Sequence, residues 1–337
     1  MNNEEKDIER QEFARRVGKN GDRILMEYFD DIGLANKTNN EINDLINRLR
    51  ICGVDIKKVF SECGRDSTLK TRVDRNQTIA IVFRFFRELG IDVSKLLEEG
   101  KYNNEREQAV YLSFNKGVKR NETTSPTFAG EDVHAYAKET GTLTDVYSLV
   151  HEISHTLYVQ NQFGEARMIL GEVIPQCMER MLDGYLIELD GRKGFDVDID
   201  TLKENIIKRR ISTAIDRFRM ASRIAKGEYK FASEKAEFSR YMLAQIYATK
   251  LMDTPLQKQR IFDFIEALKS NDIKKANDAF DMQIGKEQSK ERDRYISNSI
   301  WNLQKDILTF QENEIPKEQT SEVTRTVSRE NEKEPEM

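Results

Sequence analysis

The chain has 337 residues, of which 38% are hydrophobic and 34% charged, and its formal net charge is −5 at pH 7. This balance supports a folded core and excludes the strongly basic surfaces by which proteins bind nucleic acid or anionic membranes. No apolar run reaches the length of a membrane span, and the N-terminus lacks the apolar core of a signal peptide. The three cysteines, Cys52, Cys63 and Cys177, are too few and too widely spaced for a disulfide framework. We therefore expect a protein of the cytoplasm that binds neither nucleic acid nor membrane.

Helical patterns dominate the first third of the chain. Apolar residues recur at helical spacing from Ile24 to Ile32, from Ile42 to Leu49 and from Ile79 to Leu89. The whole chain has only five prolines and is rich in residues that favour helices. We therefore expect residues 1–105 to form a helical N-terminal region that packs on the rest of the chain.

A change of pattern between residues 108 and 140 predicts two short strands. Residues Ala109 to Phe114 form the first, and Val133 to Ala137, which alternate in polarity, form an edge strand. The polar stretch between them is expected to be a loop. The predicted fold class is therefore mainly α, of the α+β type, with a small β-sheet beside the helix that follows.

The motif His-Glu-x-x-His occurs at residues 151–155 and contains two of the three histidines of the chain. On a helix, His151 and His155 lie one turn apart on the same face and can point at one metal ion. With Glu152 beside them, they are typical of a zinc site in which the glutamate acts on a metal-bound water. Two histidines can also share a solvated face by coincidence, but with odds of about one in a hundred for this composition. The motif therefore predicts a metal site.

The residues around this motif favour a helix. Thr142 and Asp145 match a capping box, in which Asp145 would accept a hydrogen bond from the Thr142 amide. Apolar residues recur at helical spacing from Val146 to Leu157. This stripe would bury one side of the helix and turn the histidines towards a cleft.

A third protein ligand must be a carboxylate, because no histidine follows His155 in the sequence. The next helical pattern, residues 171–182, contains Glu172 and Glu179, which are two turns apart and share a face. Pro175 is tolerated in a first turn, so a helix that begins near residue 171 would place Glu172 at its mouth. Either glutamate alone could be a surface charge, and only the histidines favour a role at a metal.

The remaining segments are also helical in pattern, with helices predicted over residues 202–224, 231–252 and 259–308. A basic cluster on the first of them consists of Lys208, Arg209, Arg210, Arg217, Arg219 and Arg223. Acidic neighbours and the net charge favour a solvated helix face over a nucleic-acid surface for this cluster. Residues 313–337 carry many charges and almost nothing to bury, so this tail is expected to be disordered.

Three stretches resemble one protein family. Residues 141–155 are similar to the motif Gly-Thr-Leu-x-Asp-Val-x-x-Leu-x-His-Glu-x-Gly-His of the oligoendopeptidase F and thimet oligopeptidase family, which are zinc metallopeptidases of the gluzincin group. Residues 172–179 look like that family's Glu-Val-Pro-Ser-Gln-x-x-Glu, and residues 238–249 look like its tyrosine-rich helix. Ser154 takes the place of a glycine, the family's histidines ahead of the tyrosine helix are absent, and the family's enzymes are much longer. The chain therefore resembles a reduced relative of these peptidases.

The resemblance implies a zincin-like catalytic domain, which we place at residues 106–312, and one Zn²⁺ ion held by His151, His155 and Glu172. It implies that Glu179 orients a ligand histidine, a role for which Asp145 is the alternative. Glu152 would be the general base that takes a proton from the zinc-bound water in the hydrolysis of short peptides.

The resemblance also implies residues that face the substrate. A tyrosine of the tyrosine-rich helix, best matched by Tyr241, would stabilise the oxyanion, with Tyr229 as the alternative. An edge strand beside a metal helix can hold a peptide by strand addition, so we expect His134 and Tyr136 to contact substrate, together with Tyr229.

Two other functions stay open. The chain could be a zinc-stabilised binding or regulatory protein that has lost catalysis, which the absent histidines favour and Glu152 argues against. It could also be a helical interaction protein whose motif is a coincidence. The oligomeric state and the cleavage specificity cannot be predicted from these patterns.

Overall fold

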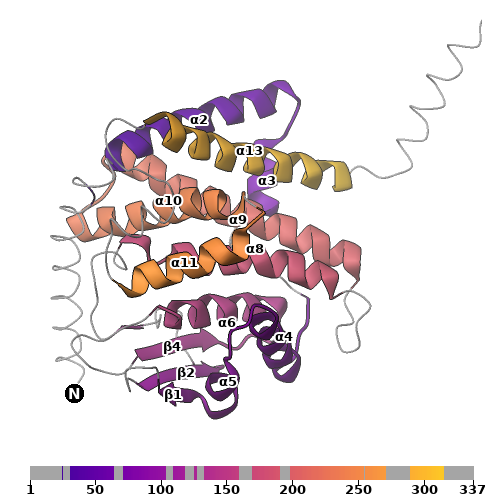
Figure 1. The fold of residues 1–337 in the computed structure, drawn as a ribbon. Helices are drawn as coiled ribbons and strands as arrows, with labels where there is room; N and C mark the ends of the chain where they lie inside the picture. The colour runs from indigo at the N-terminus through magenta and orange to yellow at the C-terminus, as the bar shows by residue number, and fades with distance from the viewer. Residues whose placement is uncertain are drawn as a thin grey trace, which may run out of the picture.

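Helices make up most of the protein (Figure 1), and the computed structural model describes residues 25, 31–63, 71–103, 109–117, 125–126, 133–158, 169–189, 198–253, 255–270 and 289–314. Most of the tail predicted to be disordered and the pattern around Ile24 lie outside these residues. The helices are α2 (Asp31–Ile51), α3 (Ile56–Glu62), α4 (Arg75–Glu88), α5 (Ser94–Glu99), α6 (Leu143–Thr156), α8 (Val173–Glu188), α9 (Ile199–Ala225), α10 (Ala232–Met252), α11 (Gln257–Lys269) and α13 (Ser289–Glu314). The strands are β1 (Lys101–Asn103), β2 (Ala109–Asn115), β3 (Ser125–Pro126) and β4 (Val133–Lys138). The predicted mainly α fold with a small sheet is confirmed.

The four strands form one mixed sheet in the order β1-β2-β4-β3. β2 and β4 run parallel, with Val110 opposite Val133 and Phe114 opposite Ala137, while β1 and β3 pair antiparallel to them. The prediction that β4 is an edge strand was therefore wrong at its first two residues, where β3 pairs with it. A two-residue strand that contains a proline has no recognisable pattern, so the sequence could not reveal it.

The alternation of β4 decides which of its side chains face helix α6. Val133, Ala135 and Ala137 are buried, and α6 packs on β4 (Figure 1). Successive side chains of a strand point to opposite faces, so His134 and Tyr136 lie on the far face of the sheet. The His134 ring stacks there between Tyr111 and Tyr136, with centroid distances of 4.9 and 6.0 Å.

The helices form layers above the sheet (Figure 1). α6 packs on α8, α8 on α10, and α10 on α9. The outer layer contains α2 and α13, which lie side by side and both contact α9. The expected N-terminal region thus contacts the rest of the chain in several places, since α2 packs on α9, α4 packs on α6 and β1 belongs to the sheet. None of the described helices has the length and apolar character that a membrane span would need.

Candidate metal centre

Helix α6 begins at Leu143, after a residue with no capping side chain. The predicted capping box is wrong, because Thr142 makes no cap hydrogen bond. The buried Asp145 carboxylate instead accepts hydrogen bonds from the amides of Thr140 at 2.9 Å and Gly141 at 2.8 Å. Gly141 has a φ of 76°, which a residue with a side chain rarely adopts, and this turn brings both amides to the carboxylate. Asp145 therefore holds the start of α6 and does not reach a histidine.

The two motif histidines meet on the face of α6 that points away from the sheet. The predicted apolar stripe is inaccessible to solvent at Val146, Leu149, Val150 and Ile153, and its last residue, Leu157, is partly buried. Nε2 of His151 lies 3.2 Å from Nε2 of His155. Both rings are partly buried, and Glu152 is partly buried beside them.

Helix α8 supplies the carboxylate opposite these rings. Glu172 is the N-cap residue of α8, and Pro175 occupies the first turn, as predicted. The Glu172 carboxylate is buried, with its oxygens 3.6 Å from Nε2 of His151 and 3.7 Å from Nε2 of His155. The three ligand atoms lie within 4.8 Å of one another, and the three residues could hold a metal ion.

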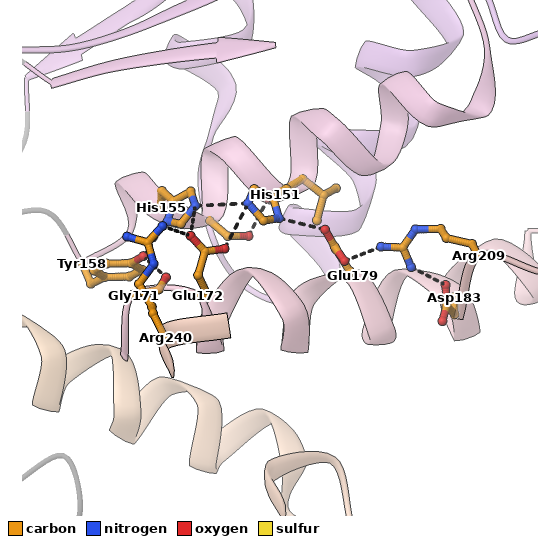
Figure 2. Close-up of polar contacts among 11 residues, drawn as sticks. His151, His155, Tyr158, Gly171, Glu172, Glu179, Asp183, Arg209 and Arg240 are labelled. Carbon is orange, nitrogen blue, oxygen red and sulfur yellow. Dashed lines mark hydrogen bonds and ion pairs between the residues drawn. The ribbon is translucent and has the colours of Figure 1, made fainter. Parts of the chain in front are cut away.

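Two neighbouring residues fix the tautomers of the histidines (Figure 2). Oε1 of Glu179 accepts a hydrogen bond from Nδ1 of His151 at 2.8 Å. The hydroxyl of Tyr158 donates to the carbonyl of Gly171, so it accepts the hydrogen bond from Nδ1 of His155, at 2.6 Å. When both histidines are neutral, each Nε2 is therefore a lone pair, and the two lone pairs face each other.

Such a set of lone pairs fits a cation. Two imidazole nitrogens at 3.2 Å repel each other unless a positive charge lies between them, and Oε2 of Glu172 is buried without a hydrogen-bond partner. Two histidines and one carboxylate are ligands that Zn²⁺ takes in sites that keep a further position open. Co²⁺ and Mn²⁺ also accept this set.

The surrounding charges favour an ionised site. Burial alone would lower the pKa of His151, but the hydrogen bond to Glu179 and the nearby carboxylates raise this pKa to about 9. Burial would raise the pKa of Glu172, but Arg240 and the two histidines lower it to about 2. Burial likewise would raise the pKa of Glu179, and Arg209 with His151 lowers it to about 2. Both glutamates are therefore carboxylates at neutral pH, and the space between them attracts a proton or a metal ion.

A chain of ion pairs extends from His151 to helix α9 (Figure 2). Arg209 donates to Oε2 of Glu179, and its guanidinium lies 3.8 Å above the ring of Tyr147 and 3.8 Å from the buried Asp183. Arg210 also donates to Asp183, at 2.7 Å. The interpretation of this basic cluster as a solvated face was therefore wrong for Arg209, because the partly buried Glu179 and the buried Asp183 of α8 face it.

Helices α9 and α10 bring further charges to Glu172. Arg240 lies 2.9 Å from Oε1 of Glu172, and the guanidinium of Arg217 lies 4.1 Å from the ring centroid of Tyr241. The carboxylate of Glu172 is the largest cause that raises the pKa of Tyr241, with burial second. Tyr241 is thus a protonated hydroxyl close to the candidate ligands.

The structure does not bring the other predicted residues to this centre. His134 and Tyr136 lie on the face of the sheet away from α6 because of strand alternation. Tyr229 lies between α9 and α10 and packs partly buried against the hydrophobic core. Conversely, sequence reasoning missed Tyr158, Arg209, Arg217 and Arg240. Only Tyr158 had a local signal, because it lies three residues after His155 and therefore near the same face.

Comparison with known proteins adds little to this geometry. The chain is similar to the crystal structure of a "putative peptidase from Chlamydophila abortus", with a TM-score of 0.48 and 14% sequence identity. The match covers 83% of this chain and 55% of that chain, so this chain spans about half the length of that protein. No family model and no curated protein matches the sequence. A likeness at this level carries no argument about activity.

Proposed function

We propose that this protein is a zinc-dependent peptidase that hydrolyses peptide bonds, in short peptides, in the cytoplasm. The observation that carries the proposal is that ligand atoms of His151, His155 and the buried Glu172 lie within 4.8 Å of one another, with the charge of Glu152 acting on His151. The resemblance of residues 141–155 and 172–179 to the oligoendopeptidase F family supports the same reaction.

In this proposal His151, His155 and Glu172 hold one Zn²⁺ ion. When bound, the ion would polarise the substrate carbonyl and acidify a water molecule. Glu152 accepts the proton of the attacking water and then delivers it to the leaving amine nitrogen. Glu179 keeps the Nδ1 proton on His151, so that Nε2 remains a lone pair directed at the site.

Tyr241 acts at the oxygen of the reacting carbonyl. Its raised pKa keeps the hydroxyl protonated at neutral pH, so that it can donate a hydrogen bond as negative charge develops there. Tyr229 packs against the hydrophobic core between α9 and α10, so we assign this role to Tyr241 alone.

Comparison of the wild type with Glu152→Gln tests the proposal. Each protein is reconstituted with zinc and incubated with a mixed pool of peptides, which is then read by mass spectrometry. We expect the wild type to cleave the pool and the variant to lose at least a hundredfold in rate while it binds zinc with equal stoichiometry. Equal cleavage by both proteins would remove Glu152 from the mechanism and point to a contaminating protease.

A second candidate is a zinc-stabilised binding protein without catalysis. The position of Arg240 favours this alternative, because its guanidinium forms an ion pair at 2.9 Å with Oε1 of the candidate ligand Glu172. Stoichiometric zinc binding without cleavage of any peptide in the pool would support this alternative.

A further inference from the structure

Two arginines beside the candidate ligands are not explained by the reaction itself. Arg217 projects from α9 and Arg240 from α10, and their guanidinium carbons lie 4.1 and 5.2 Å from the centroid of the Tyr241 ring. Both distances are within the range of cation–π contacts. Two like charges are thus gathered at one aromatic ring next to Glu172.

The pairing of these arginines is incomplete. Arg240 has Glu172 and Tyr241 as partners, whereas Arg217 makes no hydrogen bond or ion pair with any residue in the described part of the chain. The Nε atoms of both side chains are buried without an acceptor. A buried Nε–H group without an acceptor is costly, and Arg217, which is half-buried, also has no ion pair with a described residue, so an acceptor supplied by a ligand would be favourable here.

The charge of the centre leads to the same conclusion. The carboxylates close to the histidines are Glu152, Glu172 and Glu179, and the guanidiniums are Arg209, Arg217 and Arg240. With the exposed Glu237, which acts on Arg240, four carboxylates face three guanidiniums, so a divalent cation with two neutral histidines would leave one positive charge uncompensated. Arg209 is paired with Glu179 and Asp183, and Arg240 is paired with Glu172, which leaves Arg217 as the guanidinium that can receive an anion, with Arg240 beside it.

We propose that Arg217, together with Arg240, binds a carboxylate group of the substrate and so directs cleavage to peptide bonds near that group. This inference rests on the proposed peptidase function. The carboxylate is either the free C-terminus of a peptide or an acidic side chain, since a guanidinium fork recognises both in the same way. Arg217 determines specificity, and it is not a catalytic residue.

Binding measured without turnover tests this assignment. The zinc-loaded Glu152→Gln protein is titrated calorimetrically with three acetylated tetra-alanine probes. One has a free C-terminus, one is amidated, and one is amidated with glutamate at its third position. We expect at least one carboxylate probe to bind about ten- to a hundredfold more tightly than the neutral amide. If the first probe binds more tightly than the neutral amide, the site recognises the C-terminal carboxylate. If the third probe does so, the site recognises an acidic side chain.

Variants of α9 separate the role of Arg217 from general effects. In the Glu152→Gln protein, the further substitution Arg217→Gln should reduce the preference for the carboxylate probe over the neutral amide to about twofold or less. Arg217→Lys should retain part of this preference. Arg219→Gln is the matched control, because Arg219 is 64% exposed on the same helix and pairs with Asp216. Similar binding of all three probes, no measurable binding, or an advantage that persists in Arg217→Gln would each overturn the proposal.

Failure of this inference can be told from failure of the proposed function. Cleavage of the peptide pool by the wild type without any carboxylate preference would retain the peptidase and remove the anion site. Carboxylate-selective binding without cleavage would retain the anion site and support the binding-protein alternative.

Discussion

Two side chains outside the ligand set decide which nitrogen of each candidate ligand carries the proton. Glu179 accepts from Nδ1 of His151, and the hydroxyl of Tyr158, which itself donates to Gly171, accepts from Nδ1 of His155. In the neutral rings, each of these hydrogen bonds leaves the Nε2 atom as a lone pair directed at the other ring. The affinity for a cation therefore depends on single atoms that are not ligands.

Tyr158→Phe removes one of these atoms. We expect the affinity for zinc to fall about tenfold, because His155 loses the acceptor that fixes its ring and tautomer. Competition with a chromogenic chelator measures this change. Tyr229→Phe is the control, since Tyr229 packs against the hydrophobic core between α9 and α10. Unchanged zinc affinity in Tyr158→Phe would contradict the proposed role of the hydroxyl.

A second single residue, Asp306, predicts how the stability of the fold depends on pH. Its burial raises its pKa to about 6, against the opposing effect of Arg210, from a reference value of 3.8. A carboxyl group whose pKa is raised by folding stabilises the fold when protonated. That stability is lost as the pH rises from about 4 to 6. Asp306→Asn has no carboxyl group and avoids this loss. The difference in unfolding free energy, variant minus wild type, should therefore be about 2–3 kcal/mol larger above pH 6 than at pH 4.

Urea unfolding of both proteins between pH 4 and pH 8 measures this difference. The gap should widen across the window from pH 4 to 6 and then stay constant. A gap that does not change with pH would show that the carboxyl group titrates normally in the folded protein.

At the scale of elements, buried charges join three helices. Glu179 and Asp183 of α8 lie between His151 and Tyr147 of α6 on one side and Arg209 of α9 on the other. The ionised groups are paired, so this network is stable as a unit but costly to break at one member. The orientation of His151 thus depends on how α8 and α9 pack.

Arg209→Met should have two separable effects. Loss of the cation leaves the Glu179 charge buried, so we expect a loss of about 3–5 kcal/mol in unfolding free energy and ten- to a hundredfold in zinc affinity. Adding Glu179→Gln should restore part of the stability but none of the zinc affinity. Arg219→Met, on the exposed side of α9, should change neither. Recovery of both properties in the double variant would show that Arg209 has only a structural role.

At the scale of the whole molecule, the candidate site joins two layers. His151 and His155 belong to α6, which packs on the sheet, whereas Glu172 begins α8, which packs on the helical layers above (Figure 1). A cation held by all three residues would link these layers in the folded state only. Its removal should therefore destabilise the protein as a whole.

Chelation tests this link. At a free zinc concentration one hundred times Kd, binding adds about 2.7 kcal/mol to the unfolding free energy, so the Tm should rise by about 5 °C relative to protein in EDTA. Calorimetric scans of the wild type and His151→Ala, each with and without zinc, measure the shift, which the variant should lose. An identical Tm for the wild type in both conditions would favour the helical interaction protein with a coincidental motif.

What the sequence determined by itself is local. The 3.6-residue period placed His151 and His155 on one face, the apolar stripe buried the other face, and the position of Pro175 indicated that α8 begins beside Glu172. These features depend only on residues within one or two turns of each other. The backbone geometry of a single helix is enough to fix them.

Only the tertiary structure decided which groups surround the ligands. Arg209 lies 30 residues from Glu179 in the sequence, and Arg240 lies even further from Glu172, yet each pair is in contact. The short strand β3 and the far-face position of His134 were likewise not visible in local patterns. A periodic pattern fixes the direction of a side chain relative to its own helix or strand, but its partner depends on how that element packs against the others. The tautomers, the charge balance and the contact of Arg217 with Tyr241 therefore follow from the packing of α6, α8, α9 and α10.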